Sequence, residues 1–117
     1  MKFGFFMMPS HSVGDNPTLA FERDLQLIEY AESLGFDEFW VGEHHGSGWE
    51  TIPAPDIFLA AAAARTKRIR LGTAVINLPY HHPFQVAERM AFLDHLSYGR
   101  LMLGCGPGVT PSDIQLF

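Results

Sequence analysis

The sequence predicts an α/β fold in which parallel strands alternate with helices. Apolar segments with strand character alternate with segments of helical periodicity, and glycine or proline separates one segment from the next. Each strand and the helix after it take roughly 30 to 35 residues, as expected when right-handed crossovers join parallel strands. Together these three observations place all the expected strands in one sheet.

The first unit begins with residues 2–8, a nearly continuous apolar run that Pro9 closes. Such a run is typical of a strand covered on both faces. Asn16 and Pro17 then supply a helix cap and a first helical residue, and Gly35 ends the helix. The apolar positions of this helix recur at helical spacing, namely Leu25, Leu27, Ile28, Ala31 and Leu34.

The second unit begins with residues 36–42, whose aromatic and β-branched side chains favour a strand. A loop with glycine and proline, residues 46–55, leads to the second helix. Asp56 suits the positive N-terminal end of that helix, and the alanines of residues 60–64 have high helix propensity.

The third unit comprises a strand over residues 69–76 and a helix that Pro83 opens. The apolar face of this helix contains Val86, Met90, Leu93 and Leu96. Residues 100–105 predict a fourth strand, and the glycine-rich loop 104–108 follows it. Ser112 and Asp113 suit the cap and first turn of a fourth helix.

Four strands and three complete helices make up about half of a (β/α)8 TIM barrel, which needs eight strands and usually about 250 residues. We therefore expect residues 1–117 to form one domain, the N-terminal half of such a barrel, truncated within its fourth helix.

The composition favours a small-molecule or protein partner. Hydrophobic residues make up 47% of the chain, which is enough for a core, and the net charge of −5 is scattered. We expect no binding to nucleic acid or membranes, because no patch of like charge and no apolar stretch of roughly 20 residues is present. The single cysteine, Cys105, cannot form an internal disulfide, and we expect a cytoplasmic protein.

Ligands of parallel α/β folds bind beyond the carboxyl ends of the strands, so the residues just after each strand are candidates for a site. Five of the six histidines fall there: His11, His44, His45, His81 and His82. The opposite rim carries charges that we interpret as solvated: Lys67, Arg68, Arg70 and Arg100.

His44 is the candidate acid or base, because an imidazole titrates near neutral pH and Glu43 or His45 could tune it. The alternative is a histidine satisfied by backbone hydrogen bonds. A metal site is the weaker interpretation, because adjacent residues on an extended chain point in opposite directions, so neither histidine pair presents two ligands to one ion.

The loop of residues 104–108 could allow a planar or phosphorylated ligand to approach the backbone, since glycine tolerates close contact. It does not match the dinucleotide fingerprint, because Val109 stands in place of a glycine and Pro107 has no amide donor. A tight turn is the alternative. We interpret Cys105 as a small, buried apolar residue rather than a reactive thiol.

Four segments together resemble the luciferase-like monooxygenases, and their order and spacing match across essentially the whole chain. They are MKFGFFMMP, LGFDEFWVGEHH, RIRLGTAVINLPYHHP and LDHLSYGRLMLGCGPG. The resemblance implies a flavin-dependent monooxygenase that uses reduced FMN and dioxygen on a small organic substrate. It makes His44 the catalytic acid or base and places Met8, Glu43 and His45 at the substrate pocket.

The resemblance also implies a cofactor site, with Thr73, Ala74 and Val75 under the flavin ring and a cis peptide bond between the last two. Further cofactor contacts are implied for Gly104, Cys105 and Gly106. Family members often have arginine where this chain has Pro107, so the resemblance implies a weakened phosphate anchor. Some relatives use a deazaflavin for hydride transfer instead.

The partners implied are the substrate, dioxygen, a flavin reductase and a second copy of the chain in a homodimer. Two other functions remain open. The first is a non-catalytic half-barrel that self-associates or pairs with a partner chain, because its edge strands are unpaired. The second is a metal-dependent hydrolase built on the histidine-rich rim.

Overall fold

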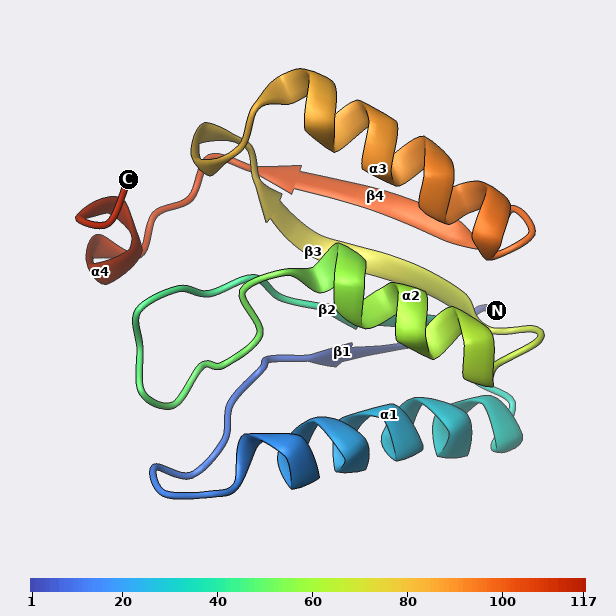
Figure 1. Ribbon diagram of the computed structural model, residues 1–117. Helices are drawn as coiled ribbons and strands as arrows, with labels where there is room; N and C mark the ends of the chain where they lie inside the picture. Colours follow the sequence, from blue (N-terminus) through green and yellow to red (C-terminus); the bar gives the residue numbers. More distant parts are fainter.

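The computed structural model describes residues 1–117, and its strands and helices alternate along the chain (Figure 1). The strands are β1 (Gly4–Met7), β2 (Glu38–Val41), β3 (Arg70–Asn77) and β4 (Leu101–Gly106). The helices are α1 (Pro17–Ser33), α2 (Pro55–Arg65), α3 (Pro83–Leu96) and the short α4 (Pro111–Ile114), with one 3₁₀ turn, η1 (Leu78–Tyr80). The expected order of elements is confirmed.

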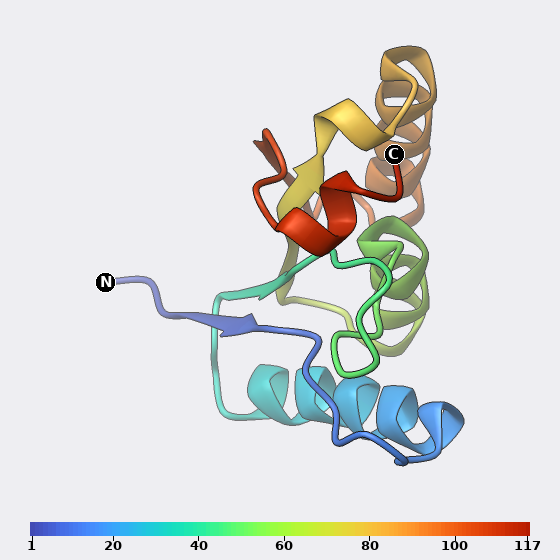
Figure 2. The ribbon, with the colours of Figure 1, turned by 90° about the vertical axis from the view of Figure 1, so that its left-hand side faces the viewer.

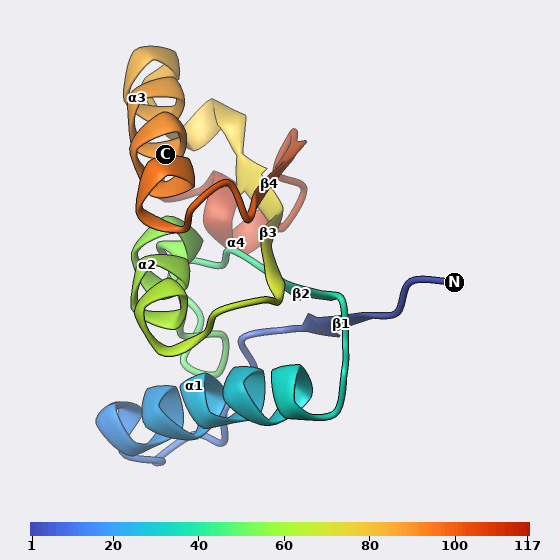
Figure 3. The same ribbon diagram turned by 90° about the vertical axis from the view of Figure 1, so that its right-hand side faces the viewer.

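The four strands form one parallel sheet in the order β1-β2-β3-β4. Helices α1, α2 and α3 all lie on one face of this sheet (Figure 3). The α/β class and the four parallel strands are therefore confirmed. None of the helices has the length and apolar character needed to cross a membrane.

The core lies between the sheet and the three long helices. Phe39 and Leu71 are partners in the register of β2 and β3, and both are fully buried. Ile28 of α1 and Leu59 of α2 pack into the same cluster. Burial of each such side chain stabilises the fold by roughly 1.5–3 kcal/mol, so the core fixes the strand ends that carry the loops.

The other face of the sheet is uncovered, which corrects the expectation that the first strand is buried on both sides. Phe6 of β1 is 51% exposed, and its register partner on β2 is Trp40, which in turn lies beside Gly72 of β3. No helix lies over this face (Figure 3). At its centre the ring of Trp40 lies over Gly72, where any Cβ would clash with the ring.

Helix ends agree with the sequence signals in α1 and differ in α4. The Asn16 side chain accepts a hydrogen bond from the Thr18 amide at 2.9 Å, and Gly35 has a φ of 89°. In α4 the capping position is Thr110, one residue before Pro111, so Ser112 is not the cap. Two helical residues expected in the apolar faces, Leu34 and Leu96, are exposed because they lie at the ends of their helices.

The amino-terminal rim is more tightly bonded than expected. The Arg100 guanidinium is partly buried and donates hydrogen bonds to four backbone carbonyls and one hydroxyl, those of Ser97, Ala63, Thr66, Ile69 and the Thr66 side chain. Arg68 donates to the carbonyls of Glu32 and Phe36. The prediction of solvated charges is wrong for Arg100, whereas Lys67, Arg68 and Arg70 are exposed.

Candidate functional site

The loops that follow the strands gather with α4 at the carboxyl end of the sheet (Figure 2). The loop after β2 supplies Glu43, His44 and His45, and η1 with the following turn supplies Tyr80 and His81. Because parallel strands all end at this edge, side chains far apart in the sequence meet there.

Glu43 is the buried centre of this rim. Its Oε1 atom lies 2.8 Å from His45 Nε2 and 2.8 Å from His81 Nε2. Its Oε2 atom accepts a hydrogen bond from the Asn77 amide at 3.1 Å, and the Asn77 side chain donates to the Glu43 carbonyl at 3.2 Å. Glu43 therefore holds two imidazoles in place and joins the end of β2 to the end of β3.

His44 has carboxylates beside both ring nitrogens. Its Nδ1 lies 3.3 Å from Asp113 Oδ2, and its Nε2 lies 3.5 Å from Glu50 Oε1. The other oxygen of Asp113 accepts a hydrogen bond from the His45 amide at 3.2 Å. The ring is thus bonded to side chains and not to backbone groups, and a positive charge on it would be compensated.

A pocket of about 190 Å³ opens beside His44. The side chain of His44 is 17% exposed, and the pocket brings it together with Ala74 and Val75 of β3. The peptide bond between these two residues is cis, as the family resemblance implies. The remaining lining consists of Glu43, Asn77, Pro107, Gly108, Val109 and Thr110.

The other residues expected to contact the cofactor do not line the pocket beside His44. The Thr73 hydroxyl donates to the Gly104 carbonyl at 2.9 Å and accepts from the Gly104 amide at 3.1 Å, so both residues join β3 to β4. Cys105 is exposed, which corrects the expectation of a buried thiol. Cys105 is the register partner of Ile76, which packs against α3, so it lies on the helix side of β4 together with Leu101 and Leu103. Gly106 passes close to Val75, where a larger residue would clash.

A second pocket, of about 330 Å³, is lined mainly by the β2–α2 loop. His44 and His45 both line it, together with Glu50 and with Phe117 at the end of the chain. His44 therefore borders two pockets. Met8 is expected at the substrate pocket and lines neither of them.

The sequence interpretation missed three residues of this rim: Glu50, Tyr80 and Asp113. Glu50 and Asp113 are buried beside His44, and both lie in segments that follow a strand, so the rule that pointed to the histidines applies to them too. The Tyr80 hydroxyl is buried without a hydrogen-bond partner. Burial raises the pKa of this phenol above 10.0, and the charges of Asp113 and Glu43 add to the effect.

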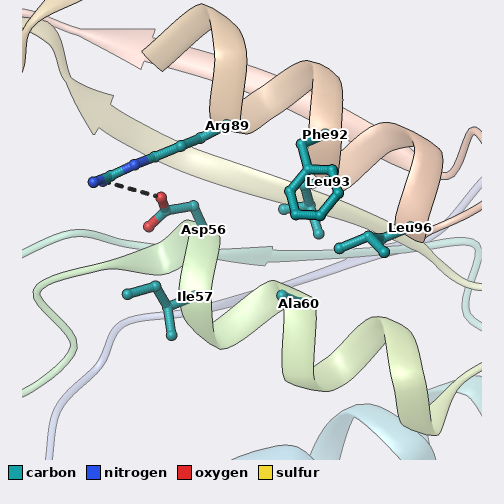
Figure 4. Close-up of a pocket in the computed structure, with 7 residues that line it drawn as sticks. All are labelled: Asp56, Ile57, Ala60, Arg89, Phe92, Leu93 and Leu96. Atoms are coloured by element: carbon teal, nitrogen blue, oxygen red, sulfur yellow. Dashed lines mark ion pairs between the residues drawn. The ribbon is translucent and has the colours of Figure 1, made fainter. Parts of the chain in front are cut away.

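A groove of about 260 Å³ lies on the helical side of the molecule, between α2 and α3 (Figure 4). Asp56 and Arg89 form an ion pair of 3.6 Å at one end of it. The rest is mainly apolar, with Ile57, Ala60, Phe92, Leu93 and Leu96. None of the predicted site residues lines this groove.

Comparison with known proteins gives consistent matches along the chain. The profile of the family described as luciferase-like monooxygenase matches residues 1–117. The chain is 54% identical over 115 residues to a 4-hydroxyprotoasukamycin monooxygenase of Streptomyces nodosus subsp. asukaensis, covering 98% of this chain and 31% of the relative. It is 50% identical to limonene 1,2-monooxygenase of Rhodococcus erythropolis, covering 99% and 30%. The chain thus spans about a third of the length of these relatives.

Solved structures share the same fold. The oxygenating constituent of 3,6-diketocamphane monooxygenase from Pseudomonas putida, in complex with FMN, superposes with a TM-score of 0.93 at 31% identity, covering 99% of this chain and 32% of that one. A coenzyme F420 dependent tetrahydromethanopterin reductase from Methanopyrus kandleri gives a TM-score of 0.78 at 30% identity, covering 98% and 29%.

Proposed function

The chain belongs to the luciferase-like monooxygenase family, and from this premise we propose that it forms part of a flavin-dependent monooxygenase. The reaction would use reduced FMN and dioxygen to oxidise a small organic substrate. The observation that carries the proposal is the position of His44, which lies between two pockets with a carboxylate beside each ring nitrogen.

The smaller pocket fits part of a flavin. Its wall of Ala74 and Val75 is apolar and free of long side chains, which suits a flat ring. No lysine or arginine lines it, and Pro107 offers no amide hydrogen, so these residues do not fit the phosphate of FMN. At about 190 Å³ the pocket is also smaller than the roughly 300 Å³ at which ligand sites usually begin. This chain would therefore hold the ring system only.

In this proposal His44 takes up or releases a proton at Nε2, the nitrogen beside Glu50. Asp113 faces Nδ1 at 3.3 Å and would orient the ring, because a partner on one nitrogen fixes which nitrogen carries the reacting proton. Reduced FMN, when bound, would supply the reduction of dioxygen. Ala74 and Val75 would keep water from the ring face.

Replacement of His44 tests its role in a full-length protein that contains this chain. We expect His44→Ala to lower kcat at least tenfold, since general acid or base catalysis contributes roughly 100-fold or more. The matched control is His82→Ala, which removes an exposed histidine of the same rim that lines neither pocket. Unchanged turnover in His44→Ala would remove His44 from the mechanism.

A binding experiment with the 117-residue chain tests the cofactor. We expect reduced riboflavin to bind within about threefold of reduced FMN, because a threefold ratio is less than 1 kcal/mol and no cation here contacts the phosphate. An anaerobic titration followed by flavin fluorescence would measure both. A deazaflavin belongs in the same series, because one related structure depends on coenzyme F420. Selective binding of the deazaflavin would favour hydride transfer over oxygenation.

The partners in this proposal are dioxygen, the organic substrate, a cytoplasmic flavin reductase that supplies reduced FMN, and a second copy of the chain. The homodimer is supported by the groove between α2 and α3, whose Phe92 and Ile57 are well exposed (Figure 4). Contiguous exposed apolar surface of this kind marks interaction sites. Phe92→Ser should therefore convert a dimer to a monomer in sedimentation velocity.

A second candidate function is a non-catalytic half-barrel that associates through its sheet. The uncovered face, with the exposed Phe6, favours it, as do the unpaired edges of β1 and β4. The same sedimentation experiment separates the two interfaces. Association that survives Phe92→Ser and is lost in Phe6→Ser would favour the second candidate.

A further inference from the structure

We propose that Glu43, His45 and His81 bind a divalent transition-metal cation. The three side chains come from two different loops and offer one carboxylate oxygen and two imidazole nitrogens. These three atoms all lie within 4.8 Å of one another. Two imidazoles with one carboxylate form the donor set of many mononuclear zinc and non-haem iron sites.

Adjacent histidines do not supply the ligands, in agreement with the geometry of an extended chain. His44 faces Asp113 and Glu50. His82 is exposed and does not belong to the cluster of Glu43, His45 and His81. One member of each pair, His45 and His81, instead converges on the same oxygen, Glu43 Oε1. Ligands from separate loops can therefore face one ion although neighbouring side chains on one strand point in opposite directions.

The charge of the rim provides a second, independent reason for a cation. Glu43, Glu50 and Asp113 are all buried. Their ion-pair partners are histidines alone, and every lysine or arginine pair of the structure involves other acidic residues. Buried carboxylates are costly unless cations or hydrogen bonds compensate them, and a divalent ion at Glu43 would add a cation that no lysine or arginine supplies there.

The cluster is also built and accessible in the way a metal site requires. The Glu43 side chain is fully buried, and its second oxygen is fixed by the Asn77 amide. The side chains of His45 and His81 are 14% and 25% exposed, so an ion can enter from their side. A fourth position would remain open to water, as in catalytic zinc sites.

Binding requires a small rearrangement with a balanced loss of protons. The present separations of 2.8 Å between oxygen and nitrogen are those of shared hydrogen bonds. Zinc bonds of about 2.0–2.2 Å in a tetrahedron would separate the ligand atoms by about 3.3 Å. Each Nε2 must then be without a proton, and the proton moves to Nδ1 or to water.

Calorimetric titration of the untagged 117-residue chain with Zn²⁺ tests the site. We expect one equivalent of Zn²⁺ to bind, with an affinity at least about 10-fold lower in His45→Ala and in His81→Ala, since loss of even an indirect partner costs 10-fold or more. His82→Ala and His95→Ala should bind as the unchanged chain does, because neither residue belongs to the cluster. A rise in the thermal unfolding midpoint should follow the same pattern.

The variants decide the proposal even where folding is incomplete. An unfolded chain would lose affinity equally with each histidine removed, and that pattern would overturn the site, because only the fold joins His45 to His81. Absence of saturable Zn²⁺ binding to a folded chain would overturn it as well. The result is independent of the monooxygenase proposal, because the titration contains no flavin and measures no turnover.

Discussion

The two ends of the sheet use charged side chains in opposite ways. At the amino end, the Arg100 guanidinium and the Glu32 carboxylate bond almost entirely to the backbone of neighbouring loops. At the carboxyl end, His44, Glu43 and Asp113 bond largely to other side chains.

This difference separates stability from chemistry. A charge that is saturated by carbonyls and amides has no free donor or acceptor for a ligand, and its loss exposes several backbone groups at once. A histidine between carboxylates keeps a nitrogen beside a pocket and contributes little to the joining of elements. The amino end of such folds is accordingly the stabilising end, and the carboxyl end carries the site.

The largest effect is expected for Arg100→Ala, which removes five hydrogen bonds between the ends of α2, α3 and β3. We expect the free energy of unfolding to fall by about 3 kcal/mol, because several partly buried carbonyls lose their donor together. Urea denaturation followed by far-UV circular dichroism would measure the change.

Arg70→Ala is the matched control at the same end. Its side chain is exposed and forms one ion pair of 3.8 Å with Glu38, so the expected loss is below about 1 kcal/mol. Equal losses in the two variants would show that the backbone bonds of Arg100 contribute no more than a surface ion pair, and the contrast between the two ends would not hold.

The next effect concerns Glu32 at the end of α1. Burial acts to raise the pKa of this carboxyl, but the amides of Ile69, Arg68 and Lys67 outweigh it, so the pKa lies below the usual 4.5. A lowered pKa in the folded chain means that the charged carboxylate stabilises the fold above pH 4.5, and that this contribution disappears as the pH falls through the folded pKa.

We therefore expect Glu32→Gln to lower the free energy of unfolding by about 1 kcal/mol at pH 7, a value discounted for solvent screening of a partly exposed group. The difference from the unchanged chain should shrink as the pH falls below 4.5 and through the folded pKa, because protonation makes the Glu32 side chain neutral as well. Urea denaturation at pH 7 and at pH 3 would measure it. Glu29→Gln, on the same helix with one 4.0 Å ion pair, should show little loss at either pH.

Local signals in the sequence predicted the elements of the fold well. Pro17 and Pro83 each mark the first residue of a long helix, as expected, while α2 begins at Pro55, the last residue of the expected loop, and the apolar segments between the helices form the strands. The sequence also predicted where the candidate site lies, at the carboxyl ends of the strands, because parallel strands all end at the same edge of the sheet. This rule selected His44 as a candidate, and the structure places His44, Ala74 and Val75 at one pocket.

Contacts between distant residues could not be predicted in the same way. Glu43 meets His81 across 38 positions, and His44 meets Asp113 across 69, so both pairs depend on strand register and loop path. Burial was misjudged for Phe6 and Cys105 for a related reason. An apolar residue type indicates that a side chain can be buried. Whether it is buried depends on which other segments pack against its face of the sheet.

The smallest effect is expected for His44→Gln at the carboxyl end. Its two carboxylate contacts, at 3.3 and 3.5 Å, are long, and Asp113 keeps its bond to the His45 amide without the ring. We expect the free energy of unfolding to change by less than about 0.5 kcal/mol, because the glutamine amide can still donate a hydrogen bond to one of the two carboxylates. Urea denaturation beside Arg100→Ala would measure it. A loss approaching that of Arg100→Ala would mean that His44 joins structural elements, and the two ends of the sheet would then differ in their partners but not in their roles.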